Sequence, residues 1–253
     1  MKDMNQTMQI SKVAQSFQRG LKTYHDSATQ QAQIAQRLSG LMAQHLPHHM
    51  NSALEFGIGT GHLTRVLIKN SKIDHLYLND LVSDCAEFAP RGAAFIGGPI
   101  ESMALPQNLD LICSASTVQW VEDLPSLLER FSDVLAPGGW LAVSGFGHKQ
   151  FHELRALGST AAAPNYMDAA DWRFILPQNM TIRHLSQAQT TEWFPSALSL
   201  LKHLRDTGVN GATNRSWTTQ DLQGFETEYA ERFGTNEGLP LTYDPVWILA
   251  QKA

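Results

Sequence analysis

The sequence lacks long hydrophobic runs, has few cysteines and carries no excess of basic residues. No apolar stretch in its 253 residues approaches the roughly 20 residues that a membrane-spanning helix needs. Residues 1–16 are polar and lack the apolar centre of a signal peptide. The two cysteines, Cys85 and Cys113, match neither a CxxC motif nor a disulfide framework, so we expect buried free thiols. These absences predict a cytoplasmic protein that does not associate with membranes.

The charge balance argues against nucleic-acid binding. The chain has 19 Lys and Arg residues against 24 Asp and Glu residues, a formal net charge of −5, whereas a nucleic-acid surface needs a basic footprint.

His45, His48 and His49 fall in a predicted helix-to-strand connection with no standard metal-ligand spacing, so we expect no metal site. The sequence has no G-x-S-x-G elbow, and neither cysteine has a recognisable catalytic context.

The most informative stretch is residues 54–61, which read Leu-Glu-Phe-Gly-Ile-Gly-Thr-Gly. A short apolar strand, 53–56, leads into the glycines, and Leu63, Val66 and Leu67 follow at helical spacing, so the glycines lie in a strand-to-helix turn. Glycine permits the sharp turn, and the bare main chain and the free N–H groups of the helix start can bind a ligand. The spacing differs from the G-x-G-x-x-G of dinucleotide sites because the last glycine comes one residue early.

Strands and helices alternate along the chain. The expected strands after the first are 75–78, 93–96, 109–114 and 140–144. The helix 125–135 carries an apolar stripe of helical period, and the alternation predicts a parallel sheet that binds ligands at the carboxyl ends of its strands. Asp80 follows the second strand, about 20 residues past the glycine turn, where a carboxylate can bind both hydroxyls of a ribose. A solvated loop position is the alternative for Asp80.

The Glu-x-Gly-x-Gly-x-Gly arrangement that begins at Glu55 resembles motif I of the class I S-adenosylmethionine-dependent methyltransferases. In that family the glycines pack against the amino-acid end of the cofactor. Many members carry an aspartate for the adenine amino group where this chain has Pro99, which leaves adenine recognition to other groups such as the main chain at Ile100 and Glu101. The resemblance implies S-adenosylmethionine as co-substrate, bound by Glu55, Gly57, Gly59, Gly61, Asp80, Leu81, Ile100, Glu101 and Ser114. A glycine-rich turn without a ligand is the alternative.

The expected single domain has four parts. These are N-terminal helices at about 5–46, a core at 50–146, a lid insertion at about 147–215, and a closing helix and strand at 218–252. Tyr24 joins the N-terminal helices and can present its hydroxyl to the site, although a core or surface position fits it equally well. The lid is otherwise irregular but contains a helix that Ser196 caps and Gly208 ends. The closing helix, 219–232, precedes a strand at 241–250 that we expect to run antiparallel in the sheet.

Four segments together resemble the malonyl-[acyl-carrier-protein] O-methyltransferases of biotin biosynthesis. They are Phe17 to Tyr24, Val118-Gln119-Trp120 after Ser114, Leu200 to Gly208, and Leu239 to Tyr243. The resemblance implies a Rossmann-like class I methyltransferase fold, with a mostly parallel seven-stranded sheet, an antiparallel last strand and a helical lid. It also implies methylation of the free carboxylate of malonyl-acyl carrier protein, or of malonyl-coenzyme A, early in the synthesis of the pimeloyl moiety of biotin.

The implied reaction needs no catalytic base. A carboxylate with a pKa of about 4 is already ionised at neutral pH, which leaves alignment and desolvation as the main tasks. Arg205 is our candidate for orienting the malonyl carboxylate, with helix capping or contact with the carrier protein as alternatives. We expect Gln119 and Trp120 to line the substrate pocket with Tyr24, unless Trp120 is simply a core residue.

Acyl carrier proteins are strongly anionic, so their docking surface on this acidic chain must be locally basic. The candidate residues are Arg19, Lys22, Lys202, His203, Arg205 and Arg215. Two other functions stay open: a methyltransferase for another small carboxylic acid or metabolite, and a non-catalytic S-adenosylmethionine-binding protein. A substrate panel separates the first, and cofactor binding without methyl transfer would indicate the second.

Overall fold

The computed structural model describes residue 18 and residues 29–159, 163–207 and 218–253. The chain divides into two compact units. The sheet unit comprises residues 29–147, 163–188 and 245–253. The described part of the smaller unit comprises residue 18 and residues 148–159, 189–207 and 218–244. Within these described ranges no helix is long and apolar enough to cross a membrane. Tyr24 and the first expected helix fall outside them.

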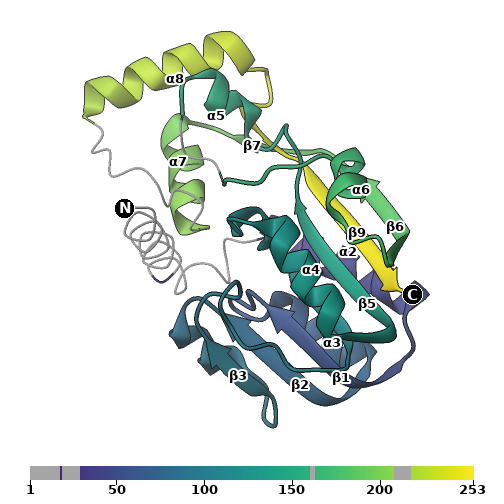
Figure 1. Cartoon of the computed structure of the whole chain (residues 1–253). Helices are drawn as coiled ribbons and strands as arrows, with labels where there is room; N and C mark the ends of the chain where they lie inside the picture. Colours follow the sequence, from purple (N-terminus) through teal and green to yellow (C-terminus); the bar gives the residue numbers. More distant parts are fainter. Residues whose placement is uncertain (1–17, 19–28, 160–162, 208–217) are drawn as a thin grey trace, which may run out of the picture. The chain divides into compact units, whose positions relative to one another are not determined.

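A seven-stranded sheet in the order β3-β2-β1-β4-β5-β9-β6 forms the sheet unit (Figure 1). Its strands are β1 His49–Phe56, β2 Lys72–Asp80, β3 Ala94–Gly97, β4 Leu109–Ala115, β5 Leu135–Phe146, β6 Met180–Gln187 and β9 Pro245–Lys252. The pairs from β3 to β5 are all parallel, whereas β9 runs antiparallel to both β5 and β6. The predicted mostly parallel sheet with one antiparallel strand is therefore confirmed.

Helices cover both faces of this sheet. They are α2 Thr29–His45, α3 His62–Asn70, α4 Leu124–Val134 and α6 Trp172–Ile175, with the 3-10 turns η1 Ser83–Phe88, η2 Val118–Trp120 and η3 Ala169–Asp171. Alternate residues of a strand point to opposite faces. On β9, Ile248 belongs to the core cluster that contains Phe131 of α4, whereas Trp247 donates from Nε1 to the Ile34 carbonyl of α2 at 3.1 Å. Helix α4 thus packs against one face of the sheet, and helix α2 packs against the other. Cys85 and Cys113 are free and buried, as predicted.

Three strands begin earlier than expected, and β2 is extended by three residues, to Lys72. β1 starts at His49, so this histidine lies on a strand, and its Nε2 lies 2.8 Å from Asp74 Oδ2 of β2. β5 starts at Leu135 and includes the Pro-Gly-Gly segment, whose register against β4 is irregular. A Cβ added at Gly139 would lie 2.8 Å from the Leu109 carbonyl oxygen, so the close approach of the two strands requires a glycine there.

The expectation of one irregular lid over 147–215 was wrong for part of the region. β6 completes an edge of the main sheet, and Thr190–Phe194 forms β7 in a separate two-stranded sheet with β8, Leu239–Tyr243. The expected closing strand is therefore two strands, β8 and β9, which Asp244 separates. Its buried carboxylate accepts a hydrogen bond from the Lys149 N–H at 3.0 Å, and its own N–H donates to Gln150 Oε1 at 2.9 Å. These bonds hold the main chain where it leaves one sheet for the other.

In its described residues, the smaller unit combines the β7–β8 pair with three helices. They are α5 His152–Ala156, α7 Ala197–Asp206 and α8 Thr219–Phe233. The Ser196 hydroxyl accepts a hydrogen bond from the Ser199 N–H at 3.2 Å, which confirms the predicted cap of α7. α7 buries Leu200 and Leu204. Gly208, the predicted stop of this helix, lies outside the described residues.

Candidate cofactor site

Three glycines shape the turn between β1 and α3. Gly57, Gly59 and Gly61 have φ angles of 66°, 51° and 77°, in the left-handed region that favours glycine. The Gly57 N–H donates to the carbonyl of Asn79 at 2.8 Å, which attaches the turn to the end of β2. The predicted strand–glycine–helix arrangement is confirmed.

The surroundings of the first two glycines differ. A Cβ added at Gly57 would lie 2.1 Å from Thr117 Oγ1, whereas one added at Gly59 would meet no atom within 4 Å. The hydroxyl of the next residue, Thr60, is buried and makes no hydrogen bond to any described residue. The turn thus contains a packed glycine at Gly57, open space at Gly59 and an unused polar group at Thr60, and this combination suits a bound ligand.

Alanine substitutions should separate these two positions. Gly57→Ala is expected to destabilise the fold by about 2–4 kcal/mol, because it adds a clash with Thr117 to the strained φ angle. Gly59→Ala is expected to destabilise the fold by only about 1 kcal/mol, because the strained φ angle is its sole cost, but it places a methyl group in the open space. Urea unfolding and calorimetric titration with S-adenosylhomocysteine check both effects. Equal stability of the two variants would contradict the packing assigned to Gly57.

Glu55, the acidic residue of the motif, is buried near the end of β1. Burial raises the pKa of its carboxyl to about 8. Hydrogen bonding with Thr64, including its main-chain N–H, lowers the pKa and offsets part of this rise, whereas the nearby Asp80 carboxylate raises it further. Thr64 lies in the first turn of α3, where the N–H groups have no partners within the helix. Glu55 therefore holds the helix start against β1, and its contact with a cofactor stays a prediction.

Replacing Glu55 with glutamine is expected to remove a pH dependence of stability. The pKa of Glu55 is about 8 in the folded chain against 4.5 for an ordinary glutamate, so the folded state binds more protons between these values. The titration of Glu55 therefore lowers the free energy of unfolding as the pH rises through this window, by up to about 1.4 kcal/mol per pH unit. Urea unfolding at about pH 5.5 and about pH 7.5 measures the slope, which Glu55→Gln should flatten. Equal slopes in both proteins would contradict this assignment.

Asp80 ends β2 and holds the middle of the glycine turn. Its Oδ2 accepts a hydrogen bond from the Gly59 N–H at 2.8 Å, and its Oδ1 accepts one from the Val82 N–H at 2.9 Å. Burial raises the pKa of this carboxyl, and the two N–H groups counteract the rise. The sequence did not reveal this bracing role. The contact with ribose hydroxyls stays a prediction.

The loop after β3, predicted to meet adenine, is held by the neighbouring strand. Asn79 Nδ2 of β2 donates to the Ile96 and Gly98 carbonyls, both at 2.9 Å. Ile100 is buried in the core cluster, Glu101 is exposed, and Leu81 lies half-buried directly after Asp80. These predicted cofactor residues therefore follow the carboxyl ends of adjacent parallel strands, as the sequence indicated.

Ser114 lies deeper than its predicted role requires. Its side chain is fully buried, and its hydroxyl donates to the Phe56 carbonyl at 2.7 Å, which links β4 to β1. β4 extends to Ala115, and Ser116 follows with a φ of 58°, an uncommon conformation for a residue other than glycine. The Ser116 hydroxyl is buried and makes no hydrogen bond to a described residue. Ser116, which the sequence analysis missed, is thus the polar side chain at the end of this strand.

Gln119 and Trp120 lie in η2, directly after this strand end. Gln119 is buried and donates from Nε2 to the Ser116 carbonyl at 2.7 Å, while its Oε1 has no hydrogen-bond partner within the described part of the chain. Trp120 is half-buried. Thr117, which packs against Gly57, connects η2 to the glycine turn. The substrate-lining role of Gln119 and Trp120 stays a prediction.

Arg205 belongs to α7 in the smaller unit. Its side chain is 71% exposed, with Nε 3.1 Å from Asp206 Oδ1. His203 on the same helix is different, because its Nε2 lies 2.6 Å from the Tyr243 hydroxyl and 3.3 Å from a carboxylate oxygen of Glu192. Burial lowers the pKa of His203, so it does not belong to an exposed basic surface as predicted. Four other predicted residues, Arg19, Lys22, Tyr24 and Arg215, lie outside the described residues.

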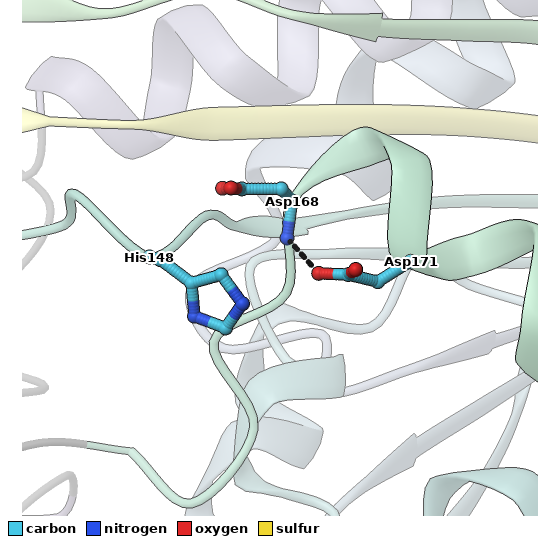
Figure 2. A group of neighbouring side chains, drawn as sticks. All are labelled: His148, Asp168 and Asp171. Atoms are coloured by element: carbon cyan, nitrogen blue, oxygen red, sulfur yellow. Dashed lines mark hydrogen bonds between the residues drawn. The ribbon is translucent and has the colours of Figure 1, made fainter.

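Two aspartates in the sheet unit have local structural roles. The Asp168 N–H donates to Asp171 Oδ2 at 2.9 Å, which caps η3 (Figure 2). Gln187 Nε2 of β6 donates to Asp168 Oδ1, also at 2.9 Å. These bonds attach η3 to the edge of the sheet. His148, drawn in the same view, belongs to the smaller unit.

The comparisons with known proteins identify the family. Residues 54–143 match the family model described as a methyltransferase domain. The chain is 34% identical over 249 residues to a malonyl-[acyl-carrier protein] O-methyltransferase of Acinetobacter baylyi, with 96% of each chain covered. The chain belongs to the malonyl-[acyl-carrier protein] O-methyltransferase family. A second member, from Prosthecochloris aestuarii, is 31% identical over 262 residues, which cover 100% of this chain and 96% of that protein.

Solved structures confirm the fold of this family member. A putative methyltransferase from Bacillus halodurans superposes with a TM-score of 0.61 at 14% identity, covering 85% of this chain and 98% of that one. The N-methyltransferase NodS from Bradyrhizobium japonicum, solved with S-adenosyl-L-homocysteine, gives 0.54 at 15% identity, covering 95% and 98%. At these identities the likeness shows the fold alone. The predicted Rossmann-like class I methyltransferase fold is confirmed.

Proposed function

We propose that this chain transfers a methyl group from S-adenosylmethionine to the free carboxylate of malonyl-acyl carrier protein, or of malonyl-coenzyme A. The observation that carries the proposal is the likeness to malonyl-[acyl-carrier protein] O-methyltransferases over nearly the full length of both chains. The methyl ester formed would enter the early synthesis of the pimeloyl moiety of biotin.

The glycine turn suits S-adenosylmethionine as co-substrate. Gly59 leaves open space in the turn, and the hydroxyl of the next residue, Thr60, is buried and makes no hydrogen bond to a described residue. Helix α3 follows at His62, with Gly61 as an N-cap that has no side-chain hydrogen bond, and the positive end of a helix favours a negatively charged group of a ligand. The proposed cofactor residues are Glu55, Gly57, Gly59, Gly61, Asp80, Leu81, Ile100 and Glu101, with Ser114 in support of the turn through its bond to Phe56.

The proposed reaction is a direct displacement. S-Adenosylmethionine supplies a methyl group that its sulfonium activates. A malonyl carboxylate oxygen attacks the methyl carbon, and the carbon–sulfur electrons pass to sulfur, which leaves a methyl ester and S-adenosylhomocysteine. The attacking carboxylate has a pKa of about 4 and needs no base at neutral pH. The enzyme then has to align the reactants and exclude water.

The substrate contacts are proposed residue by residue. Gln119 has an unused buried Oε1 that can accept a hydrogen bond, and Trp120 lies next to it in η2. Arg205 can form paired hydrogen bonds with a carboxylate, in competition with an exposed ion pair to Asp206 that is worth little. The hydroxyl of Tyr24 is a further candidate from the sequence.

The exposed face of α7 suits an anionic carrier protein. Leu198, Lys202 and Arg205 are spaced by four and three residues, so they share one face of the helix, and all three are exposed. Leu198 is 62% exposed, unusual for a leucine. An apolar side chain with two cations offers both charge complementarity and apolar area to a negatively charged partner.

A thioester panel tests the proposed function. Purified protein is incubated with methyl-labelled cofactor and with malonyl, succinyl or acetyl thioesters of the carrier protein and of coenzyme A. The label should appear as a base-labile methyl ester on the malonyl compounds, with little on the acetyl compounds, which lack a free carboxylate. Preference for another acid would favour a different small-acid methyltransferase. Tight cofactor binding without transfer to any of them would indicate a non-catalytic binding protein.

A further inference from the structure

Arg130 of α4 binds the loop after β3 through three main-chain carbonyls. Its Nη1 donates to the carbonyls of Ile100, at 3.3 Å, and Glu101. Its Nη2 donates to the carbonyl of Met103 at 2.6 Å. A guanidinium has several N–H donors in a fixed plane and keeps its charge, so a single arginine can bind several carbonyls at once.

The same loop is anchored at two other points. The side chain of Ile100 is buried in the core cluster together with Phe131 of α4. Asn79 of β2 binds the Gly98 carbonyl at the start of the loop. Strand β2 and helix α4 thus hold the loop from opposite ends, through its carbonyl groups and one apolar side chain.

The bonds that fix the loop leave its donors available. Within the described residues, Ile100 and Glu101 contribute their carbonyls to Arg130, and none of the bonds found for them uses their main-chain N–H groups. Pro99 beside them has no polar side chain and no N–H. The main-chain N–H groups of Ile100 and Glu101 can therefore serve as donors to a base that binds here, and their position depends on how firmly the loop is held.

We propose that Arg130 is a positioning residue for adenine recognition. By holding the three loop carbonyls, it fixes the Ile100 and Glu101 N–H groups where they can donate to a ring nitrogen of adenine. Arg130 acts through the loop and does not itself touch the base. The inference rests on the proposed use of S-adenosylmethionine and extends it to how this chain selects the adenine ring without a side-chain carboxylate at position 99.

The test compares two ligands that differ only at the base. S-Adenosylhomocysteine has an acceptor at N1 of adenine, whereas S-inosylhomocysteine carries a proton there and cannot accept a hydrogen bond from a main-chain N–H. Calorimetry gives the dissociation constants of both ligands for the wild type, Arg130→Met and Arg130→Lys. Arg183→Met is the matched control, because Arg183 is an exposed arginine on β6, the sheet edge opposite β3.

We expect Arg130→Met to bind S-adenosylhomocysteine roughly three- to tenfold more weakly, the effect of about one hydrogen bond. The affinity for S-inosylhomocysteine should fall by a smaller factor in this variant, so the ratio of affinities that favours the adenine ligand becomes smaller. Arg130→Lys keeps the charge but not the planar fork, and should give an intermediate preference even if Arg130→Met does not fold. Arg183→Met should match the wild type.

Two results would overturn the inference in different ways. If the wild type prefers S-adenosylhomocysteine and both Arg130 variants keep that preference unchanged, Arg130 has only a structural role. If the wild type binds neither ligand, the proposed co-substrate is wrong, and the role of Arg130 is lost with it.

Discussion

Asp80→Ala is expected to weaken the binding of S-adenosylhomocysteine by about 1.5–3 kcal/mol, or roughly 10- to 150-fold. The carboxylate braces the Gly59 N–H of the turn and is also the proposed partner of the ribose hydroxyls. Calorimetric titration measures the loss directly. Asp74→Ala on the same strand is the matched control, because Asp74 is exposed and paired with His49. The control should bind with wild-type affinity.

A second ligand separates the two roles of Asp80. The 2′-deoxy analogue of S-adenosylhomocysteine lacks one of the hydroxyls that Asp80 would bind. If Asp80 binds ribose, the wild type prefers the natural ligand and Asp80→Ala loses that preference. If Asp80 only braces the turn, the variant loses affinity for both ligands by the same factor. Unchanged affinity for both would remove Asp80 from the site.

The sequence predicted the parts of the site that depend on local main-chain geometry. Three glycines in left-handed conformation leave few alternatives to a tight strand-to-helix turn, and an acidic residue at the end of the next parallel strand must lie beside it. The glycine turn and Asp80 accordingly lie together, with a hydrogen bond from the Gly59 N–H to Asp80. Their contacts with a bound molecule are for the titrations above to establish.

Features that depend on distant partners could not be predicted in this way. Ser114 and Ser116 are two residues apart, and only the exact end of β4 decides which hydroxyl bonds to β1 and which stays unused. Likewise, the expected strand over residues 241–250 contains Asp244, and hydrogen bonds between Asp244 and residues about 95 positions earlier divide it into two strands. The role of Arg130 in holding the loop requires α4 to lie within reach of the loop after β3, which no local sequence pattern reveals.

The edge strand β6 is another feature that depends on a distant partner and that the sequence did not predict. The sequence predicts an irregular lid over these residues because their apolar pattern is weak, and in the structure only some of them are buried. Its partner β9, by contrast, is buried along most of its length and was recognised as a strand. Central strands carry a strong apolar signal, whereas an edge strand is stabilised by its neighbour and its sequence shows less of it.

Lys202→Glu and Arg205→Ala are expected to have different effects, although both residues lie on the exposed face of α7. We propose that Lys202 contacts the anionic carrier protein. Its charge reversal should then raise the KM for malonyl-acyl carrier protein roughly five- to tenfold and change turnover of malonyl-coenzyme A much less. Arg205 is the proposed partner of the malonyl carboxylate, which both substrates share. Arg205→Ala should therefore lower kcat/KM for both by roughly 10- to 100-fold.

Steady-state kinetics with the two substrates distinguish these roles. Lys69→Glu is the matched control for the change in net charge, because Lys69 is an exposed lysine on α3 of the sheet unit and should leave both activities near the wild type. If Arg205→Ala impairs only the carrier-bound substrate, Arg205 belongs to the docking surface with Lys202, and another cation must bind the carboxylate. If kcat/KM falls by the same factor in both variants and for both substrates, the division of roles between Lys202 and Arg205 is wrong. If Lys69→Glu impairs the carrier substrate as much as Lys202→Glu does, overall charge rather than the α7 face governs docking, because long-range repulsion between two acidic proteins acts regardless of position.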